Sequence, residues 1–275
     1  MNQRIFLLLI ILLSLFVAVI SLGGIFIPAT YLHETADWRA QGIAQDIFDL
    51  CFAVPALLIA TWFYLRGSRI AFFTVVGQLI FLIYTLIIYA FSLHFNAFFL
   101  LYCFTLGLAS YLLIYLLWQT GSLNVKGWFA IERSVTLPMI YLLSFAALFY
   151  MLWLNEIIPA LISSSTPAAL AESGLPTNPV YVLDLSILLP GFVITALLLK
   201  RRHALGYLFT PAIMTFCATM TLSIATLVIY EYRSGLATSF TVALIMIALA
   251  IVSIVVFLRT IQGVRSGSLF GELRT

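Results

Sequence analysis

The chain contains eight stretches of about twenty or more mainly apolar residues, each long enough to cross the roughly 30 Å hydrocarbon core of a bilayer. They cover approximately residues 5–27, 46–65, 70–93, 97–119, 135–155, 179–199, 205–230 and 236–258. Backbone polar groups find no water inside a bilayer, so segments of this length and composition must be helical. Charged residues make up 8% of the chain, against roughly 25% in a soluble domain. The sequence therefore predicts an all-α polytopic membrane protein with eight transmembrane helices, and the lipid bilayer is its first partner.

The positions of the basic residues predict an orientation. If both termini lie on the cytoplasmic side, eleven of the thirteen Lys and Arg residues lie there too, and Arg39 and Arg233 lie outside. Short loops rich in Lys and Arg stay in the cytoplasm. We therefore expect a multi-pass membrane protein with both termini cytoplasmic. The sequence has no basic domain, and we expect no nucleic-acid partner.

Most of the acidic residues fall on or near the outer half of this arrangement. They are Glu34, Asp37, Asp46, Asp49, Glu156, Glu172, Asp184 and Glu231. Two interpretations stay open. An acidic outer face attracts cations from the medium. Outer loops poor in Lys and Arg are also acidic for reasons of topology alone.

One seven-residue pattern occurs twice. Residues 49–55 read DLCFAVP, and residues 184–190 read DLSILLP, which is 135 residues later (184 minus 49). In each case an Arg follows the Asp by seventeen residues, Arg66 in the first copy and Arg201 in the second. The second and sixth spans therefore share a local pattern in a chain with few charges.

This repetition predicts two four-helix halves, residues 1–133 and 134–275. The second and sixth spans also each follow a long outer connection, 28–45 or 156–179. Because a shift of 135 residues moves four spans, the halves have the same orientation, and any symmetry axis runs along the membrane normal, as in parallel-repeat transporters. The alternative is a chance match, since Leu is abundant throughout.

The aspartates of the two patterns are the leading candidates for function. One helical face carries, at 3, 4, 4 spacing, the residues Trp38, Gln41, Gln45 and Asp49, and Asp46 lies beside Asp49 at i, i+3 spacing. Asn178 is a good N-cap for the sixth helix, so Asp184 is expected about 7 Å inside that helix at roughly 1.5 Å per residue.

We predict that Asp49 and Asp184 are paired acids in an outward-facing polar cavity that binds a cation or a small solute. An ionisable group below the headgroups faces a bundle interior or water rather than lipid. The residues expected around the two acids are Asp46, Gln45, His94 and Asn96. The alternative is that both carboxylates lie at headgroup level, where a helix N-terminus stabilises each by up to about 1 kcal/mol.

A second, weaker constellation is HETAD at residues 33–37. His33 and Asp37 at i, i+4 spacing could both ligate zinc, with Glu34 as general base and His94 as a third ligand from the next helical hairpin. The string departs from HExxH, and a polar loop with one His and two acids is ordinary.

Several cofactor chemistries find no support. Retinal needs a lysine in the middle of a span, whereas Lys126 and Lys200 lie at span edges. Haem between helices needs facing His pairs, and the three cysteines are scattered singly without a CxxC pair. We therefore expect no cofactor and no catalysis of the soluble type.

The runs QDIFDLCFAVPALLIATWFYLRGSR, FNAFFLLY and TNPVYVLDLSILLPGFVITALLLKRRHALGYL carry a resemblance. The chain resembles a widespread group of uncharacterised bacterial integral membrane proteins over most of its length. The resemblance implies a bacterial plasma-membrane location and suggests that the two Asp–Pro segments are a family hallmark. It implies no mechanism.

The leading functional prediction is therefore a transporter or channel-like protein that binds a cation or small solute from the outer side. Two alternatives stay open. One is a membrane-embedded metal-dependent enzyme at the outer face, and the other is a non-catalytic sensor or partner subunit that uses the long outer connections.

Overall fold

The computed structural model describes residues 2–130, 134–236, 238–265 and 269. Within these residues, eight helices are long and apolar enough to cross a membrane, and no strand is present apart from one isolated bridge between Phe129 and Val264. The predicted class, an all-α polytopic bundle with eight membrane-length helices, is confirmed.

Six spans are single helices and two are composite. The single ones are α1 (Gln3–Phe26), α4 (Arg69–Ser92), α5 (Phe99–Gln119), α6 (Thr136–Ile162), α10 (Ala204–Arg233) and α11 (Phe240–Ile261). The second span joins α2 (Ala36–Phe48) and α3 (Val54–Leu65) through a π-helical turn at Asp49–Ala53. The sixth joins α8 (Pro179–Leu183) and α9 (Leu189–Lys200) through a π-helical turn at Asp184–Leu188. A short helix, α7 (Ala168–Ser173), lies in the long connection before α8.

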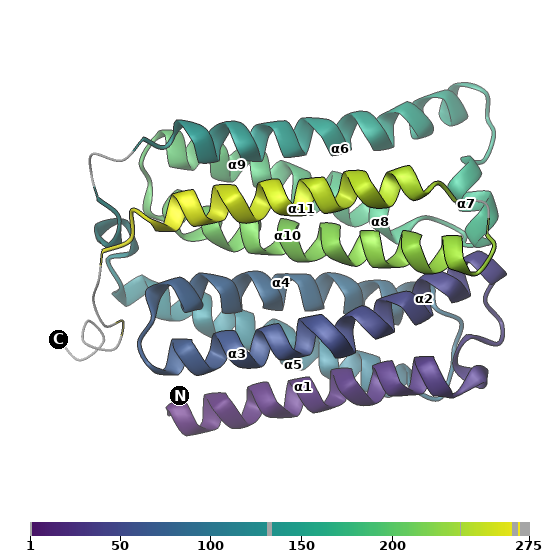
Figure 1. Ribbon diagram of the computed structural model, residues 1–275, viewed down its shortest axis with the longest axis horizontal. Helices are drawn as coiled ribbons and strands as arrows, with labels where there is room; N and C mark the ends of the chain where they lie inside the picture. Colours follow the sequence, from purple (N-terminus) through teal and green to yellow (C-terminus); the bar gives the residue numbers. More distant parts are fainter. Residues whose placement is uncertain (1, 131–133, 237, 266–268, 270–275) are drawn as a thin grey trace.

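The helices run alongside one another in a single bundle, and α1 begins at the same end at which α11 finishes (Figure 1). We call this the basic end, because the short connections 66–68 and 201–203 there carry arginines. The opposite end carries the connections 27–35 and 163–178, and we call it the acidic end.

The four spans of each half pack against one another in the same arrangement. In the first half, α1 contacts α2, α3 and α5, while α4 lies between α3 and α5. In the second half, α6 contacts α9 and α11, while α10 lies between α9 and α11. The halves meet mainly where α4 packs against α10, with further contacts of α2 with α10 and of α8 with α4. The predicted boundary at 133/134 adjoins residues 131–133, which lie outside the described residues.

The offset of 135 residues is kept in the helix boundaries. The two π-helical turns, the helices α3 and α9 that follow them, and the first residues of α4 and α10 are all related by it. At the contact between α4 and α10, a Cβ added to Gly77 would lie 2.6 Å from Cβ of Thr215 and closer still to the carbonyl oxygen of Ala212. Gly77 and Ala212 are themselves 135 residues apart, so corresponding positions meet where the halves touch. The small residue lets the two backbones approach closely, as membrane helix interfaces commonly require.

The centre of the bundle is α4, in which 72% of an 18-residue apolar window is buried, whereas the corresponding share in α11 is 22%. The outward sides of α1, α6 and α11 expose large apolar side chains such as Leu8, Met151 and Ile251. In a bilayer these side chains contact lipid tails, which are as apolar as they are.

Candidate functional site

Each Asp–Pro segment forms a π-helical turn that begins at its aspartate. The N–H of Val54 donates to the carbonyl of Asp49, and the N–H of Leu189 donates to the carbonyl of Asp184, five residues back in both cases. A proline follows each donor, and proline has no N–H and crowds the carbonyl four residues before it. The wider turn accommodates the proline without ending the helix. Its occurrence at both positions shows that the shared sequence pattern has a shared local structure.

Asp184 is almost completely buried, with 8% of its surface exposed. Its Oδ2 accepts a hydrogen bond of 2.8 Å from the indole N–H of Trp153 on α6, and its Oδ1 accepts one of 3.2 Å from the hydroxyl of Tyr84 on α4. The predicted cap holds this helix start in place, because Asn178 Oδ1 accepts from the N–H of Val180 at 2.9 Å. The Asp184 carboxyl therefore joins the two halves through donors that carry no charge.

Asp49 is buried among different partners. The side-chain amide of Gln45 donates to Asp49 Oδ1 at 2.8 Å, and the amide oxygen of Gln45 accepts from the hydroxyl of Ser223 on α10. Gln45 thus lies between Asp49 and the second half. Each aspartate is therefore linked by hydrogen bonds to the other half. Asp184 contacts Tyr84 directly, and Asp49 is linked to Ser223 through the side-chain amide of Gln45.

A cavity of about 230 Å³ lies between the halves. Its lining comes from α2, α4, α6, α8, the second π-helical turn, α9 and α10, and it includes Trp38 in the first turn of α2 and Val180 in α8. The cavity therefore lies towards the acidic end. Its wall is mostly apolar, and its polar members are Trp38, Gln41, Gln45, Tyr84, Thr85, Tyr89, Trp153, Asp184 and Ser223. Among the described residues that line it, Asp184 is the only acid, and none is Lys, Arg or His.

Asp46 does not line the cavity and belongs to a buried cluster at the α1–α2–α4 contact, which shares Tyr89 with the cavity wall. It accepts hydrogen bonds from the hydroxyls of Tyr31 at 2.6 Å and Tyr89 at 3.0 Å. Burial, and then the neighbouring carboxylate of Asp46, raise the pKa of Tyr31 well above its ordinary value. The Tyr31 phenol therefore stays protonated and donates. Gly24 on α1 makes room for the Asp46 carboxyl, because a Cβ there would lie 2.7 Å from Cγ of Asp46.

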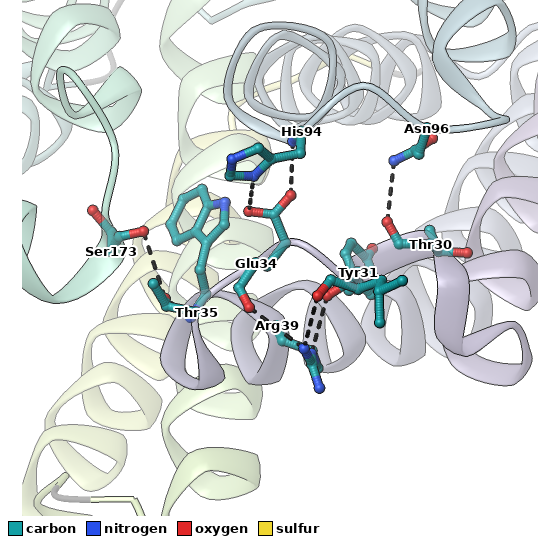
Figure 2. Close-up of polar contacts among 10 residues, drawn as sticks. Thr30, Tyr31, Glu34, Thr35, Arg39, His94, Asn96 and Ser173 are labelled. Atoms are coloured by element: carbon teal, nitrogen blue, oxygen red, sulfur yellow. Dashed lines mark hydrogen bonds and ion pairs between the residues drawn. The ribbon is translucent and has the colours of Figure 1, made fainter.

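His94 and Asn96 lie in the connection between α4 and α5 and hold the segment before α2 (Figure 2). Both the backbone N–H and Nδ1 of His94 contact the carboxyl of Glu34, at 2.7 and 3.0 Å. The Asn96 amide donates to the carbonyl of Thr30 at 3.2 Å. Neither residue lines the cavity. The structure therefore places them in a polar network that fastens the acidic-end connection.

The second half also contacts this segment, because the hydroxyl of Thr35 lies 3.5 Å from the carbonyl oxygen of Ser173 on α7 (Figure 2). The guanidinium of Arg39 donates to the carbonyls of Tyr31, Leu32 and Glu34. These bonds hold the connection against the first turn of α2. The connection 28–35 is thus held from both halves.

The alternative metal site is not assembled. In the part of the chain that the structure describes, no group of three or more His, Cys, Asp or Glu is placed to hold a metal ion. The rings of His33 and His94 are 6.2 Å apart between centroids, Asp37 accepts from the amide of Gln41 at 2.8 Å, and Glu34 is engaged by His94. Of the expected ligands, Asp37 and His94 are engaged by Gln41 and Glu34, and His33 lies beside the ring of His94.

Of the predicted site residues, Asp184 and Gln45 line the cavity. Asp49 lies behind Gln45. The other three, Asp46, His94 and Asn96, belong to the two hydrogen-bond networks described above. The sequence pattern did not indicate most of the aromatic side chains of the wall. Those that it missed are Phe145, Phe149, Trp153, Phe192 and Phe216, with Tyr84 and Tyr89. The first three recur every four residues along α6, a spacing that places them on one face of that helix.

Comparison of the chain with protein-family models, with curated proteins and with solved structures gave no match. The fold and the cavity define a multi-pass α-helical membrane protein with a partly polar cavity between its two halves.

Proposed function

We propose that this protein is a transporter that takes up a small solute into the cavity between its halves from the acidic end. The observation that carries the proposal is that both halves contribute polar groups to the cavity wall. The first half contributes Gln45 and Tyr84, and the second contributes Asp184 and Ser223. Transporters built from repeats bind their substrates near the repeat interface and alternate access by moving one repeat against the other.

Three further features support the proposal. The excess of Lys and Arg at the basic end favours a cytoplasmic location for that end and an outer location for the acidic end in a bacterial plasma membrane. The halves touch through the small residue Gly77, a contact that lets helices approach closely. The second π-helical turn contributes Asp184 and Leu188 to the cavity wall, and such turns often mark functional sites.

The test needs no knowledge of the solute. Met220→Cys, in a background without Cys51, Cys103 and Cys217, places a thiol in the cavity wall. We expect an impermeant maleimide to label it in intact cells and, more slowly, in inside-out vesicles, because a transporter exposes its site to both sides. The control is Leu82→Cys, whose position on α4 is 1% exposed and does not line the cavity.

The two sides of the membrane separate the possible outcomes. Labelling from the outside only would replace the transporter with a sensor or binding subunit. If the maleimide labels neither Met220→Cys nor the control Leu82→Cys from either side, the cavity does not open to water and the proposal is refuted.

A further inference from the structure

Six aromatic side chains of the cavity wall form a continuous arc, and Asp184 joins its two ends. Neighbouring ring centroids are separated by 5.9 Å (Tyr84–Phe216), 6.2 Å (Phe216–Phe192), 5.9 Å (Phe192–Phe145), 4.8 Å (Phe145–Phe149) and 6.2 Å (Phe149–Trp153). We call these six residues the aromatic arc. Its end members, Tyr84 and Trp153, are the two residues that donate hydrogen bonds to the Asp184 carboxyl. A closed circuit of six rings and one carboxyl therefore borders the cavity.

The carboxyl in this circuit has room for a positively charged partner. Its two donors, an indole and a phenol, are neutral, and no cationic side chain is among the described lining residues. A carboxylate has about four lone-pair positions, and these contacts use two of them. A buried carboxylate without an opposite charge is costly, so an ammonium group brought by a ligand would be stabilised there.

The rest of the wall selects for an apolar body. The amides of Gln41 and Gln45 are already engaged, with Asp37 and Asp49. Apart from the hydroxyl-bearing residues Thr85 and Ser223, the remaining surface is aromatic and aliphatic. Inorganic cations such as Ca²⁺ or Mg²⁺ need about six or more oxygen ligands, which this wall does not provide. Aromatic faces attract organic cations through their quadrupoles. The volume of about 230 Å³ lies below the roughly 300–1,000 Å³ of pockets for drug-sized ligands, so the ligand is small.

We infer that the solute is a small amphipathic monoamine, with its ammonium group at Asp184 and its apolar body against the aromatic arc. The inference rests on the proposed function and names the substrate class. The sequence predicted a cation or a small solute as the ligand, and the inference restricts that prediction to an organic cation.

Three probes with the same phenylbutyl body test this class on the detergent-solubilised full-length protein. They are phenylbutylamine, phenylbutanol and phenylbutyrate, which carry a positive, a neutral and a negative head. We expect calorimetry to show that the amine binds about tenfold or more tighter than the alcohol, and that the acid does not bind. Equal binding of amine and alcohol, or a preference for the acid, would overturn the inference.

Variants then assign the preference to the circuit. Asp184→Asn keeps the shape of the side chain and is expected to reduce the amine-over-alcohol ratio to about threefold or less, while the affinity for the alcohol stays unchanged. The matched control is Glu172→Gln, which removes an exposed carboxylate at the acidic end outside the cavity. A full amine preference in Asp184→Asn, or an equal loss in Glu172→Gln, contradicts the assignment to Asp184.

A second variant covers a failure of Asp184→Asn to fold. Phe149→Leu keeps the carboxyl and an apolar wall but removes one ring of the aromatic arc, so amine affinity should fall more than alcohol affinity. An equal fall would contradict a role for the ring. If no probe binds while Met220→Cys is labelled from both sides, the substrate class is wrong and the transporter proposal stands.

Discussion

Replacing Gly77 by alanine tests whether the close contact between α4 and α10 holds the two halves together. The added methyl carbon would lie 2.6 Å from Cβ of Thr215 and closer still to the carbonyl oxygen of Ala212. Carbon atoms pack best at about 3.5–4.0 Å, so the helices must separate by roughly 1 Å. Much of the obstacle is backbone, which cannot turn aside as a flexible side chain does.

The expected cost follows from three contributions. Overpacking a tight contact destabilises by about 1–3 kcal/mol. Separation also lengthens the 2.8 Å hydrogen bond from Gln78 to Thr219, and such bonds between membrane helices contribute about 0.6 kcal/mol. The helix propensity of alanine offsets up to about 1 kcal/mol. The net expectation for Gly77→Ala is a loss of about 1–3 kcal/mol in the free energy of unfolding.

Gly107 on α5 supplies the matched control, because a Cβ there meets nothing within 4 Å. Gly107→Ala should be neutral or stabilise the protein by up to about 1 kcal/mol. The assay is thermal unfolding of the purified protein in detergent, followed by tryptophan fluorescence, and the two variants should move the midpoint in opposite directions or differ by several degrees. Equal midpoints would refute the argument that the halves meet at Gly77.

Three further predictions concern the acidic end. Gly24→Ala should destabilise the protein by about 2–4 kcal/mol, because its methyl displaces the buried Asp46 carboxyl from its two tyrosine donors; in the same unfolding assay, adding Asp46→Ala should cost less than the sum of the single changes, and additive costs would contradict the clash. Glu156→Ala should speed limited proteolysis of the long connection, because the carboxyl oxygens that accept from the N–H of Ala169 and the hydroxyl of Tyr181 are lost; unchanged cleavage would show that these contacts do not hold the connection. An epitope inserted within 163–174 should be reached by antibody in intact cells and one after Arg274 only after permeabilisation, and the reverse result would invert the orientation.

The spans, and the start of the sixth, could be predicted from the sequence because they depend on neighbouring residues. The second helix begins earlier than expected, at Ala36, inside the stretch 28–45 that was expected to be a connection. A bilayer leaves an apolar segment of about twenty residues little alternative to a helix, and all eight spans are present. Asn178 caps the sixth span as its residue type predicts. The repeated Asp–Pro pattern indicated two segments of one kind, and both form the same π-helical turn.

The candidate site could be predicted only in part, because residues of one pattern can have different neighbours. The helical spacing correctly placed Gln41 and Gln45 on one face, and both line the cavity. It grouped Asp49 with them, whereas the structure places the amide of Gln45 between Asp49 and the second half. Loop residues such as His94 depend on contacts 60 residues away along the chain, which no local pattern records.

The aromatic arc was decided by tertiary structure alone. Its members come from α4, α6, α9 and α10, helices that are apolar around most of their circumference, so hydropathy does not indicate which face of each is turned inward. That rotation is set by the close contact of α4 with α10 at Gly77 and by the donors that Tyr84 and Trp153 direct at Asp184. The sequence by itself determined which eight segments are long and apolar enough to cross a membrane and where the sixth begins. Only the packing of eight helices at once, in which each rotation must satisfy every neighbour, decided that six rings and one carboxyl meet around a cavity.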